Sequence, residues 1–388
     1  MNIVIVEPLG HHAGHYTQEL YSFCSCLAPH VESVHVLTPF GFKEQWNPID
    51  KCTVHKLLFD PNTGTARFTS MHGPLYRPQW QFYKSASMSI RELRPDVVHV
   101  WGFKSILPLW RFLRHRNNSP KTVMTLKAVL RNHAPVLGST MLASLKEKLS
   151  YRLLRAFADL YIVHTKQLSE QAKGIGISDA NIILIPTGID KHDPTITKEE
   201  ARIKLGLPLS KFLLLFFGVL REEKGVFEVL ARVNSLPENA LLYIVGEDWT
   251  QERVESIVQR EGLQQKVICN LSYVQERDVE MHFRASDAVI IAPRAEFVGE
   301  SGVLLRAAEF GIPILAAEHG HTSTVVREEN IGAVFNKDDR LSFQAAVQQL
   351  MNDLHRSPHF FNAAMSRFRQ SREWSQIVAQ YLQVYGRG

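Results

Sequence analysis

Residues 296–320 follow the end of a strand and combine a glycine-bearing loop, a helix and a second apolar strand within one short stretch. The apolar run Val289–Ala292 predicts the first strand, Ser301 and Gly302 lie in the loop, and the helix is expected from Val303 to Phe310. Such a loop brings backbone N–H groups and the positive end of the helix dipole to one point, which favours a phosphate. The alternative is an ordinary βα turn of a parallel sheet.

A second phosphate-type feature lies upstream, in the run Phe216–Gly225. Gly218 ends an apolar strand, and Arg221 and Lys224 follow it, close to the start of the next helix. Two cations at that spacing can bind a diphosphate and offset the charge that develops on a departing one. A solvated turn, with both cations paired to neighbouring glutamates, is the alternative. Both loops follow strands at one edge of one sheet, where open α/β sheets bind ligands, so we expect a diphosphate site.

Apolar strands alternate with helical segments along most of the chain, which is typical of an α/β protein with parallel sheets. At 388 residues the chain is too long for a single core. The polar segment 187–194, marked by glycine and proline, separates two such alternating blocks. We expect one Rossmann-like domain over residues 1–188, a second over 189–371, and a last helix, 373–385, whose aromatic face docks on another surface.

Composition indicates a globular protein, since 45% of the residues are apolar and 21% are charged. No apolar run approaches the roughly 20 residues that a membrane-spanning helix needs. The N-terminal run Met1–Val6 is typical of a first strand and lacks the features of a signal peptide. The four cysteines show no metal-type spacing, which suits a reducing compartment. We therefore expect a cytoplasmic protein.

Charge is distributed unevenly along the chain. Residues 101–155 hold eleven basic side chains and a single acid, Glu147. An excess of this density favours attraction to an anionic membrane surface or to a polyanionic substrate. Charged outer faces of core helices are the alternative. The first interpretation predicts peripheral association with the inner face of a membrane, and we expect no nucleic-acid partner.

Three histidines in the first glycine loop, His11, His12 and His15, raise the question of a metal. His11 and His15 have the spacing of one helical turn, but this loop is not expected to be helical and has no cysteine or acidic ligand nearby. We therefore expect no metal site. His15 is interpreted as a hydrogen-bonding group for a substrate, with a plain surface histidine as the alternative.

Several runs of the sequence resemble the GT-B glycosyltransferases, most closely the retaining family 4 type. These runs are IPTGID, FFGVLREEKG, LLYIVGED, GIPILAAEHG and the closing WSQIVAQYLQVY. The resemblance covers most of the chain, is strong over residues 182–335 and is weak over residues 38–78. It implies two Rossmann-like domains that face each other across a cleft, with residues 372–388 crossing back to the first domain.

The same resemblance implies roles for individual residues. The donor would be a UDP- or GDP-linked sugar bound mainly to the second domain, with its diphosphate on Arg221 and Lys224 and without a cofactor. The acceptor would bind to the first domain. The implied donor-binding residues are Gly14, His15, Gly218, Glu247, Tyr273, Val274, Ser301 and Gly302.

Some positions depart from the family pattern. The family's paired glutamates would fall at Val298 and Arg306, and the second of them usually holds the ribose hydroxyls. Glu300 is expected to take over part of the work at the transferred sugar. Lys127 stands where the family commonly has a histidine near that sugar, and Trp101, at the end of its strand, is a candidate to stack on an acceptor sugar.

Residues and resemblance together predict a retaining glycosyltransferase that moves a sugar from a nucleoside diphosphate to a hydroxyl of a glycan, a glycolipid or a polysaccharide. The leaving diphosphate can take the acceptor's proton on the same face, so no carboxylate nucleophile is needed. A non-catalytic partner subunit or sugar-nucleotide sensor of the same fold is the alternative that the departures favour. A sugar-nucleotide epimerase is less favoured, because the first domain lacks the acids and the histidine expected for that chemistry.

Overall fold

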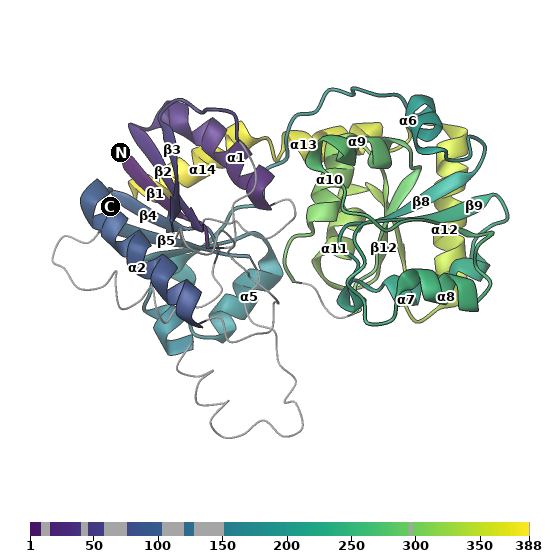
Figure 1. The fold of residues 1–388 in the computed structure, drawn as a ribbon, viewed down its shortest axis with the longest axis horizontal. Helices are drawn as coiled ribbons and strands as arrows, with labels where there is room; N and C mark the ends of the chain where they lie inside the picture. Colours follow the sequence, from purple (N-terminus) through teal and green to yellow (C-terminus); the bar gives the residue numbers. More distant parts are fainter. Residues whose placement is uncertain are drawn as a thin grey trace, which may run out of the picture. The chain divides into compact units, whose positions relative to one another are not determined.

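The computed structural model describes residues 1–8, 16–39, 46–57, 76–102, 120–127, 151–294 and 298–387. The chain forms two compact units (Figure 1). The first unit comprises Met1–Gly188 with Trp374–Gly388, and the second comprises Ile189–Glu373. Each unit is built on one parallel sheet with helices on both sides, which confirms the predicted pair of Rossmann-like domains.

The first unit contains a seven-stranded sheet with the order β3-β2-β1-β4-β5-β6-β7. Its strands are β1 (Asn2–Val6), β2 (Ser33–Pro39), β3 (Cys52–Leu57), β4 (Val97–Val100), β5 (Lys121–Leu126), β6 (Leu160–Val163) and β7 (Ile182–Leu184). Its described helices are α1 (Tyr16–Leu27), α2 (Tyr76–Leu93), α5 (Lys166–Gly174) and α14 (Trp374–Gly386), with 3-10 turns η1 (Ala28–His30) and η2 (Asp179–Asn181).

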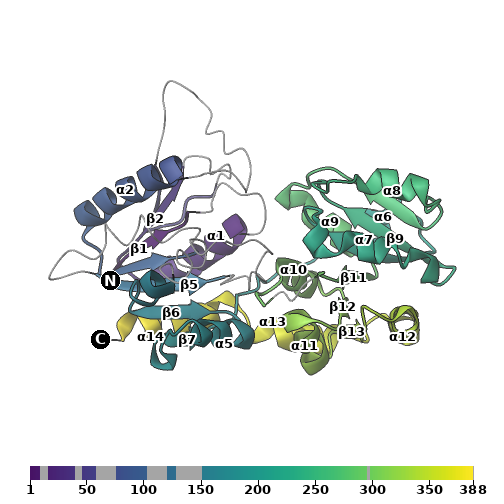
Figure 2. The same ribbon diagram turned by 90° about the horizontal axis from the view of Figure 1, so that it is seen from below.

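The last helix, α14, belongs to the first unit although it follows the second in sequence. Its Trp374, Ile377 and Tyr381 are buried in one cluster with Phe23 of α1, and the rings of Phe23 and Tyr381 lie 4.8 Å apart. Figure 2 shows α2 on one side of the first sheet and α14 on the other. The Lys121 ammonium donates a hydrogen bond to the carbonyl of Val384 at 2.7 Å. The predicted return of this helix to the first domain is thereby confirmed.

The second unit contains a six-stranded sheet with the order β10-β9-β8-β11-β12-β13. Its strands are β8 (Phe212–Phe217), β9 (Ala240–Val245), β10 (Val267–Asn270), β11 (Ala288–Ile291), β12 (Ile314–Ala317) and β13 (Gly332–Phe335). Its helices are α6 (Lys198–Leu205), α7 (Val226–Leu230), α8 (Val254–Arg260), α9 (Glu276–Arg284), α10 (Gly302–Phe310), α11 (Gly320–Glu329), α12 (Arg340–Arg356) and α13 (Asn362–Gln370), with 3-10 turns η3 (Glu222–Lys224) and η4 (Val233–Ser235).

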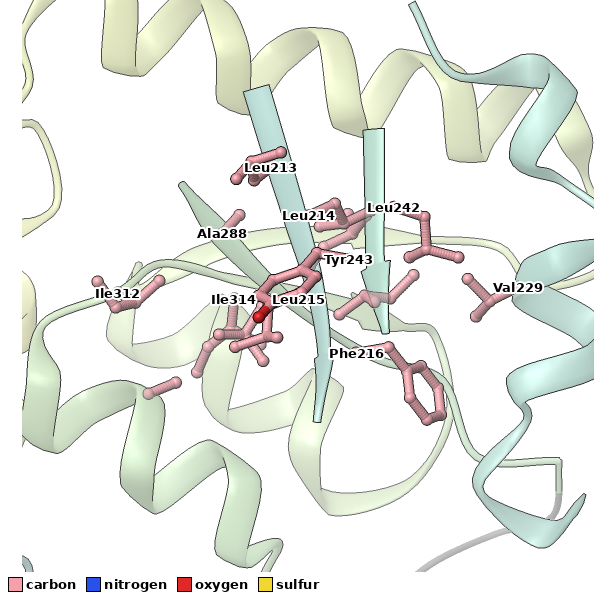
Figure 3. Close-up of a cluster of buried hydrophobic side chains, with 14 of the residues drawn as sticks. Leu213, Leu214, Leu215, Phe216, Val229, Leu242, Tyr243, Ala288, Ile312 and Ile314 are labelled. Atoms are coloured by element: carbon pink, nitrogen blue, oxygen red, sulfur yellow. The ribbon is translucent and has the colours of Figure 1, made fainter. Parts of the chain in front are cut away.

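The central strand of this sheet, β8, carries a continuous apolar sequence because it is covered on both faces. Figure 3 shows Leu213, Leu214, Leu215 and Phe216 within the surrounding apolar cluster. The strand pairs in parallel with β9 on one side and with β11 on the other. Its carboxyl end therefore lies between the carboxyl ends of β9 and β11, and the loops that leave these three strands meet at one edge.

Candidate functional site

The point at which the strand order reverses in the second sheet lies between β8 and β11, and this is where doubly wound sheets bind their ligands. The loop after β8 contains residues 218–225, and the loop after β11 leads to α10. The two loops are joined by a backbone hydrogen bond of 3.0 Å from the amide of Arg294 to the carbonyl of Glu223. The two predicted phosphate features therefore do lie at one edge of one sheet.

Three glycines allow the loops at this edge to pack backbone against backbone. Gly218, Gly225 and Gly246 all have positive φ angles, of 98°, 78° and 137°. A β-carbon on Gly225 would overlap the carbonyl oxygen of Ala292, and one on Gly246 would overlap the carbonyl oxygen of Gly218. Side chains are excluded at Gly225 and Gly246 by contact as well as by conformation. The structural roles of Gly225 and Gly246 were not predicted, although both glycines were visible in the sequence at loop and strand ends.

Lys224 lies over the loop that follows β8. Its Nζ is 3.0 Å from the position that a β-carbon on Gly218 would occupy. Burial and the nearby guanidinium of Arg221 lower the pKa of Lys224 to about 8, against the opposing effect of Glu223. An anion bound beside this half-buried ammonium would stabilise its charged form. A lysine with a lowered pKa at a ligand-binding edge therefore favours an anionic ligand.

Arg221 stands at the start of the 3-10 turn η3 with an extended backbone, φ −137° and ψ 148°. Its Nε lies 3.3 Å from a carboxylate oxygen of Glu223, and about a third of the side chain is exposed. This contact is the charged-turn pairing that the sequence left open for Arg221. Because Glu223 is itself nearly half exposed, the pair is weak and an incoming diphosphate can compete for the guanidinium.

The helix α10 begins at Gly302, with Ser301 as its N-cap. The Ser301 hydroxyl accepts a hydrogen bond of 3.4 Å from the amide of Leu304, so the serine fixes the start of the helix. The amides of Gly302 and Val303 belong to the first turn, whose N–H groups have no partner within the helix itself. This geometry agrees with the expected anion-binding end of a helix, although neither residue's role toward a donor is tested by it.

Glu300 is held in a contact that the sequence did not predict. Its side chain is 3% exposed and forms an ion pair with Arg372, while Nε2 of His321 lies 3.8 Å from the same carboxylate oxygen. The Arg372 guanidinium also stacks on the ring of Phe368 at 4.5 Å. The Glu300 carboxylate thus ties the loop before α10 to the segment before α14. Work at the transferred sugar would require this ion pair to open.

The remaining donor-binding residues expected in the second unit follow β9 and β10, the two strands on one side of β8. Only Gly246 separates Glu247 from the end of β9, and the Glu247 side chain is exposed. Tyr273 and Val274 lie between β10 and α9, with Tyr273 exposed and Val274 packed against the core. All three therefore lie on loops that leave the carboxyl edge of the same sheet, as a nucleotide pocket there would require.

Val298 and Arg306, which stand where the family has its paired glutamates, have different surroundings. Val298 precedes α10 and is half-buried. Arg306, on α10 itself, is mostly buried and lies between two carboxylates. Its guanidinium contacts Glu309 at 2.7 Å and forms a second ion pair with Glu276 at the start of α9. Arg306 is thus a linker between two helices of the second unit.

In the first unit, the structure corrects the role expected for Trp101. This side chain is only 1% exposed, and its ring lies 4.4 Å from the ring of Phe23 and 5.9 Å from that of Tyr381. An indole that packs between core aromatics cannot also stack on an acceptor sugar, so that expectation was wrong. The aromatic face of α14 explains the difference: the return of this helix to the first domain was predicted, but its contact with Trp101 was not.

Lys127, at the carboxyl end of β5, is mostly buried. Its ammonium contacts Glu19 of α1 at 2.8 Å and lies 4.9 Å from the centre of the Trp101 ring. An ion pair with this degree of burial orients both side chains. The role of Lys127 near a sugar remains a prediction.

Some expectations fall outside the described residues. Gly14 and His15, with His11 and His12, belong to these, as does most of the basic window 101–155. Within the part of the chain that the structure describes, no group of three or more His, Cys, Asp or Glu residues is arranged to hold a metal ion. Nor does any helix in that part combine the length and apolarity needed to cross a bilayer. Membrane association through residues 101–155 therefore remains a prediction.

Comparison with known proteins supplies independent evidence. The family model described as Glycosyltransferase Family 4 matches residues 20–193, and the one described as Glycosyl transferases group 1 matches residues 197–365. A curated relative, D-inositol 3-phosphate glycosyltransferase from Xylanimonas cellulosilytica, is 25% identical over 242 residues, which cover 59% of this chain and 57% of the relative. The chain thus matches little more than half the length of this relative.

Solved structures resemble the whole chain. Sucrose-phosphate synthase from Thermosynechococcus elongatus superposes with a TM-score of 0.78 at 18% identity, covering 99% of this chain and 98% of that one. HepE from Anabaena in complex with UDP gives a TM-score of 0.73 at 18% identity and 99% coverage of both chains, and another HepE structure contains UDP-glucose. At these identities the likeness shows the GT-B fold. With a family model on each half, the chain belongs to the GT-B glycosyltransferases of the family 4 type.

Proposed function

We propose that this protein transfers a sugar from a nucleoside diphosphate sugar to an acceptor hydroxyl, with retention of configuration at the anomeric carbon. The observation that carries the proposal is the position of the Lys224 ammonium over Gly218, where the strand order of the second sheet reverses. A half-buried cation with a lowered pKa at that point favours an anionic ligand, and family membership makes a diphosphate the natural one.

In this reaction the residues of the site would stabilise the negative charge of the leaving diphosphate. Transfer breaks the bond between the anomeric carbon and the diphosphate oxygen and forms a bond from the same carbon to the acceptor oxygen. The acceptor's proton passes to the departing diphosphate on the same face, which retains the configuration. Arg221 and Lys224 would stabilise the negative charge that develops on the leaving group, and the first turn of α10 would add backbone donors. Two cations and a helix end can neutralise the diphosphate without a metal.

The donor is proposed to be UDP-linked, with GDP as the second candidate. Support for UDP comes from the structural neighbour HepE, which has been solved with UDP and with UDP-glucose. The acceptor is proposed to be a hydroxyl of a glycan, a glycolipid or a polysaccharide, bound by the first unit. Docking of residues 101–155 on an anionic membrane would bring a lipid-linked acceptor to the enzyme.

The test is a transfer assay with UDP- and GDP-sugars and a panel of glycan and glycolipid acceptors. Release of nucleoside diphosphate is measured, and the anomeric configuration of the product is read by NMR. We expect transfer with retention, and a fall in turnover of about 100-fold or more when either Arg221 or Lys224 is replaced by a neutral residue. Inversion would refute the proposed mechanism, and undiminished turnover in both variants would refute the proposed roles.

A second candidate, a sugar-nucleotide sensor without turnover, is supported by two side chains. Arg306 stands at a position where the family usually has a glutamate, and it is already paired with Glu276 and Glu309. The Glu300 carboxylate is likewise paired with Arg372. Nucleotide binding without hydrolysis or transfer to any acceptor of the panel would favour the sensor.

A further inference from the structure

The second unit exposes a tryptophan on a loop at the same edge of the sheet as the proposed diphosphate site. Trp249 follows β9 and is 51% exposed, whereas the aromatic residues of β8 and β9 are largely covered. Tryptophan combines a large flat apolar surface with an N–H donor, which suits it to stacking on another ring. The question is therefore what kind of ligand Trp249 meets.

The backbone register places Trp249 next to Arg221. Beyond the ends of β8 and β9, Leu220 and Asp248 form a parallel β-bridge. Backbone hydrogen bonds run from the Leu220 amide to the Glu247 carbonyl at 2.8 Å and from the Trp249 amide to the Leu220 carbonyl at 3.0 Å. The two loops thus continue the pairing of their strands past the edge of the sheet.

Side chains alternate between the two faces of such a pair. Leu220 and Asp248 are both buried, so they point inward. By this alternation, Arg221 and Trp249, one residue later, are placed on the opposite face, where the Arg221 side chain is about a third exposed and Trp249 about half. Neighbouring strands lie roughly 5 Å apart, so the guanidinium and the indole leave the backbone from adjacent points. Glu247 projects from the same exposed face, one position before the bridge.

The loop that carries Trp249 is firmly held. The buried carboxylate of Asp248 accepts hydrogen bonds from the amides of Thr250 at 3.0 Å and Val254 at 2.8 Å. The Arg253 guanidinium donates to the carbonyl of Asp248. With the Trp249 amide also bonded, the indole is presented by a backbone that is fixed on both sides. A ring on a fixed support loses little conformational entropy when it binds a ligand.

We propose that the indole of Trp249 is the stacking platform for the nucleobase of the donor. The inference rests on the proposed function, because it takes the diphosphate to lie on Arg221 and Lys224. In a nucleoside diphosphate the base is the flat aromatic part of the molecule, joined to the phosphates through the ribose. A ligand with its diphosphate at Arg221 therefore has an aromatic ring to place close by, and Trp249 offers the neighbouring flat surface. Glu247, on the same face, offers a carboxylate to N–H or hydroxyl donors of the nucleoside.

The experiment separates the nucleoside from the diphosphate. Isothermal titration calorimetry with UDP, GDP and inorganic pyrophosphate is carried out on the wild type, W249A and W249F. F360A is the control, because Phe360 is also exposed, at 46%, but lies between α12 and α13. Stacking of a base on an aromatic side chain contributes enough that its removal should weaken UDP binding, or GDP binding if that is the preferred nucleotide, by about tenfold.

Pyrophosphate affinity should stay within about twofold of the wild type in W249A, since the loop that grips the diphosphate is unchanged. W249F should recover most of the loss, and F360A should match the wild type. Unchanged nucleotide affinity in W249A would overturn this inference while leaving the proposed function intact. Equal losses of nucleotide and pyrophosphate would overturn it too, because Trp249 would then support the loop and not the base. If the wild-type protein binds neither UDP nor GDP, both the proposed function and this inference are wrong.

Discussion

The lowered pKa of Lys224 has a consequence for binding that can be measured. Below pH 8 the side chain is largely protonated, and at higher pH the free protein loses this cation as the pH rises through about 8. A bound diphosphate favours the charged form, so nucleotide binding must then recapture a proton. We predict that UDP or GDP affinity is steady between about pH 6.5 and 7.5 and falls steadily above pH 8. Calorimetry in buffers of increasing pH measures this.

A K224R variant is the control for that profile, since an arginine stays charged throughout the range. It should bind more weakly than the wild type, because the guanidinium is larger than the ammonium, yet its affinity should not fall between about pH 8 and 9, before the nucleobase itself loses a proton. A wild-type profile that is flat to about pH 9 would show that Lys224 does not contact the nucleotide.

Glu300 provides a second prediction at the scale of single residues. Replacing it with glutamine leaves the mostly buried guanidinium of Arg372 without its partner charge. Breaking a buried pair from one side costs about 3 kcal/mol or more, so we expect E300Q to lower the midpoint of thermal unfolding by roughly 6 °C. E318Q is the matched control, because Glu318 pairs with Arg327 at the surface and both are about half exposed.

The double variant E300Q/R372M should recover much of the loss, because it removes the stranded charge as well. If E300Q unfolds like E318Q, the ion pair with Arg372 does not hold this loop, and the pair would not oppose the role at the sugar that the sequence analysis expects for Glu300.

Single residues also show where sequence reasoning fails. Arg221, Lys224, Ser301 and Gly302 could be placed on loops of the second domain because strand ends and glycines are local signals. Trp101 could not, since its burial depends on α14, which is distant in sequence. The ion pair between Glu300 and Arg372 likewise joins residues that are far apart in sequence, so no local pattern predicts it.

At the scale of elements, the loops at the carboxyl edge of the second sheet depend on glycine. We predict that G225A is strongly destabilising and loses nucleotide binding. The new β-carbon would overlap the Ala292 carbonyl, and the alanine would also have to adopt the positive φ angle of this position. G206A is the control: Gly206 also has a positive φ, of 64°, but no heavy atom would lie within 4 Å of the new carbon. Backbone strain alone should cost G206A about 1–2 kcal/mol.

Thermal unfolding and nucleotide titration of the two variants separate strain from collision. G206A should keep the nucleotide affinity of the wild type. G225A should be clearly less stable than G206A and should bind the nucleotide more weakly. Equal behaviour of the two would show that the contact between Gly225 and Ala292 does not organise the site.

Elements with a strong local signal were predictable, and others were missed. The strands β8 and β9 are continuous apolar runs, and the helix α10 is bounded by Ser301 and Gly311. The helix α6 was missed because it is short and mostly polar, although its capping box between Thr197 and Glu200 was a visible signal. The helix α8 begins only at Val254, because Asp248 accepts hydrogen bonds from the amides of Thr250 and Val254 and holds the residues between them in a turn.

At the scale of the whole molecule, the fold class followed from the repeated alternation of strands and helices in two blocks. The last helix completes the first unit: Tyr385 of α14 hydrogen-bonds the buried His99 of β4 at 2.6 Å, and His99 in turn contacts Thr125 of β5 at 2.8 Å. The first unit therefore depends on residues at the far end of the chain, and the full chain is the right material for every experiment.

The central claim is that Arg221 and Lys224 together bind the diphosphate of a nucleotide. The most direct test is titration calorimetry of UDP and GDP with the wild type and with R221Q/K224Q. K204Q/R327Q, which removes the same charge from exposed positions on α6 and α11, is the control. Loss of two charge-assisted contacts should weaken the preferred nucleotide by about 100-fold or more, while the control binds like the wild type. Equal affinity in the wild type and R221Q/K224Q would contradict the account.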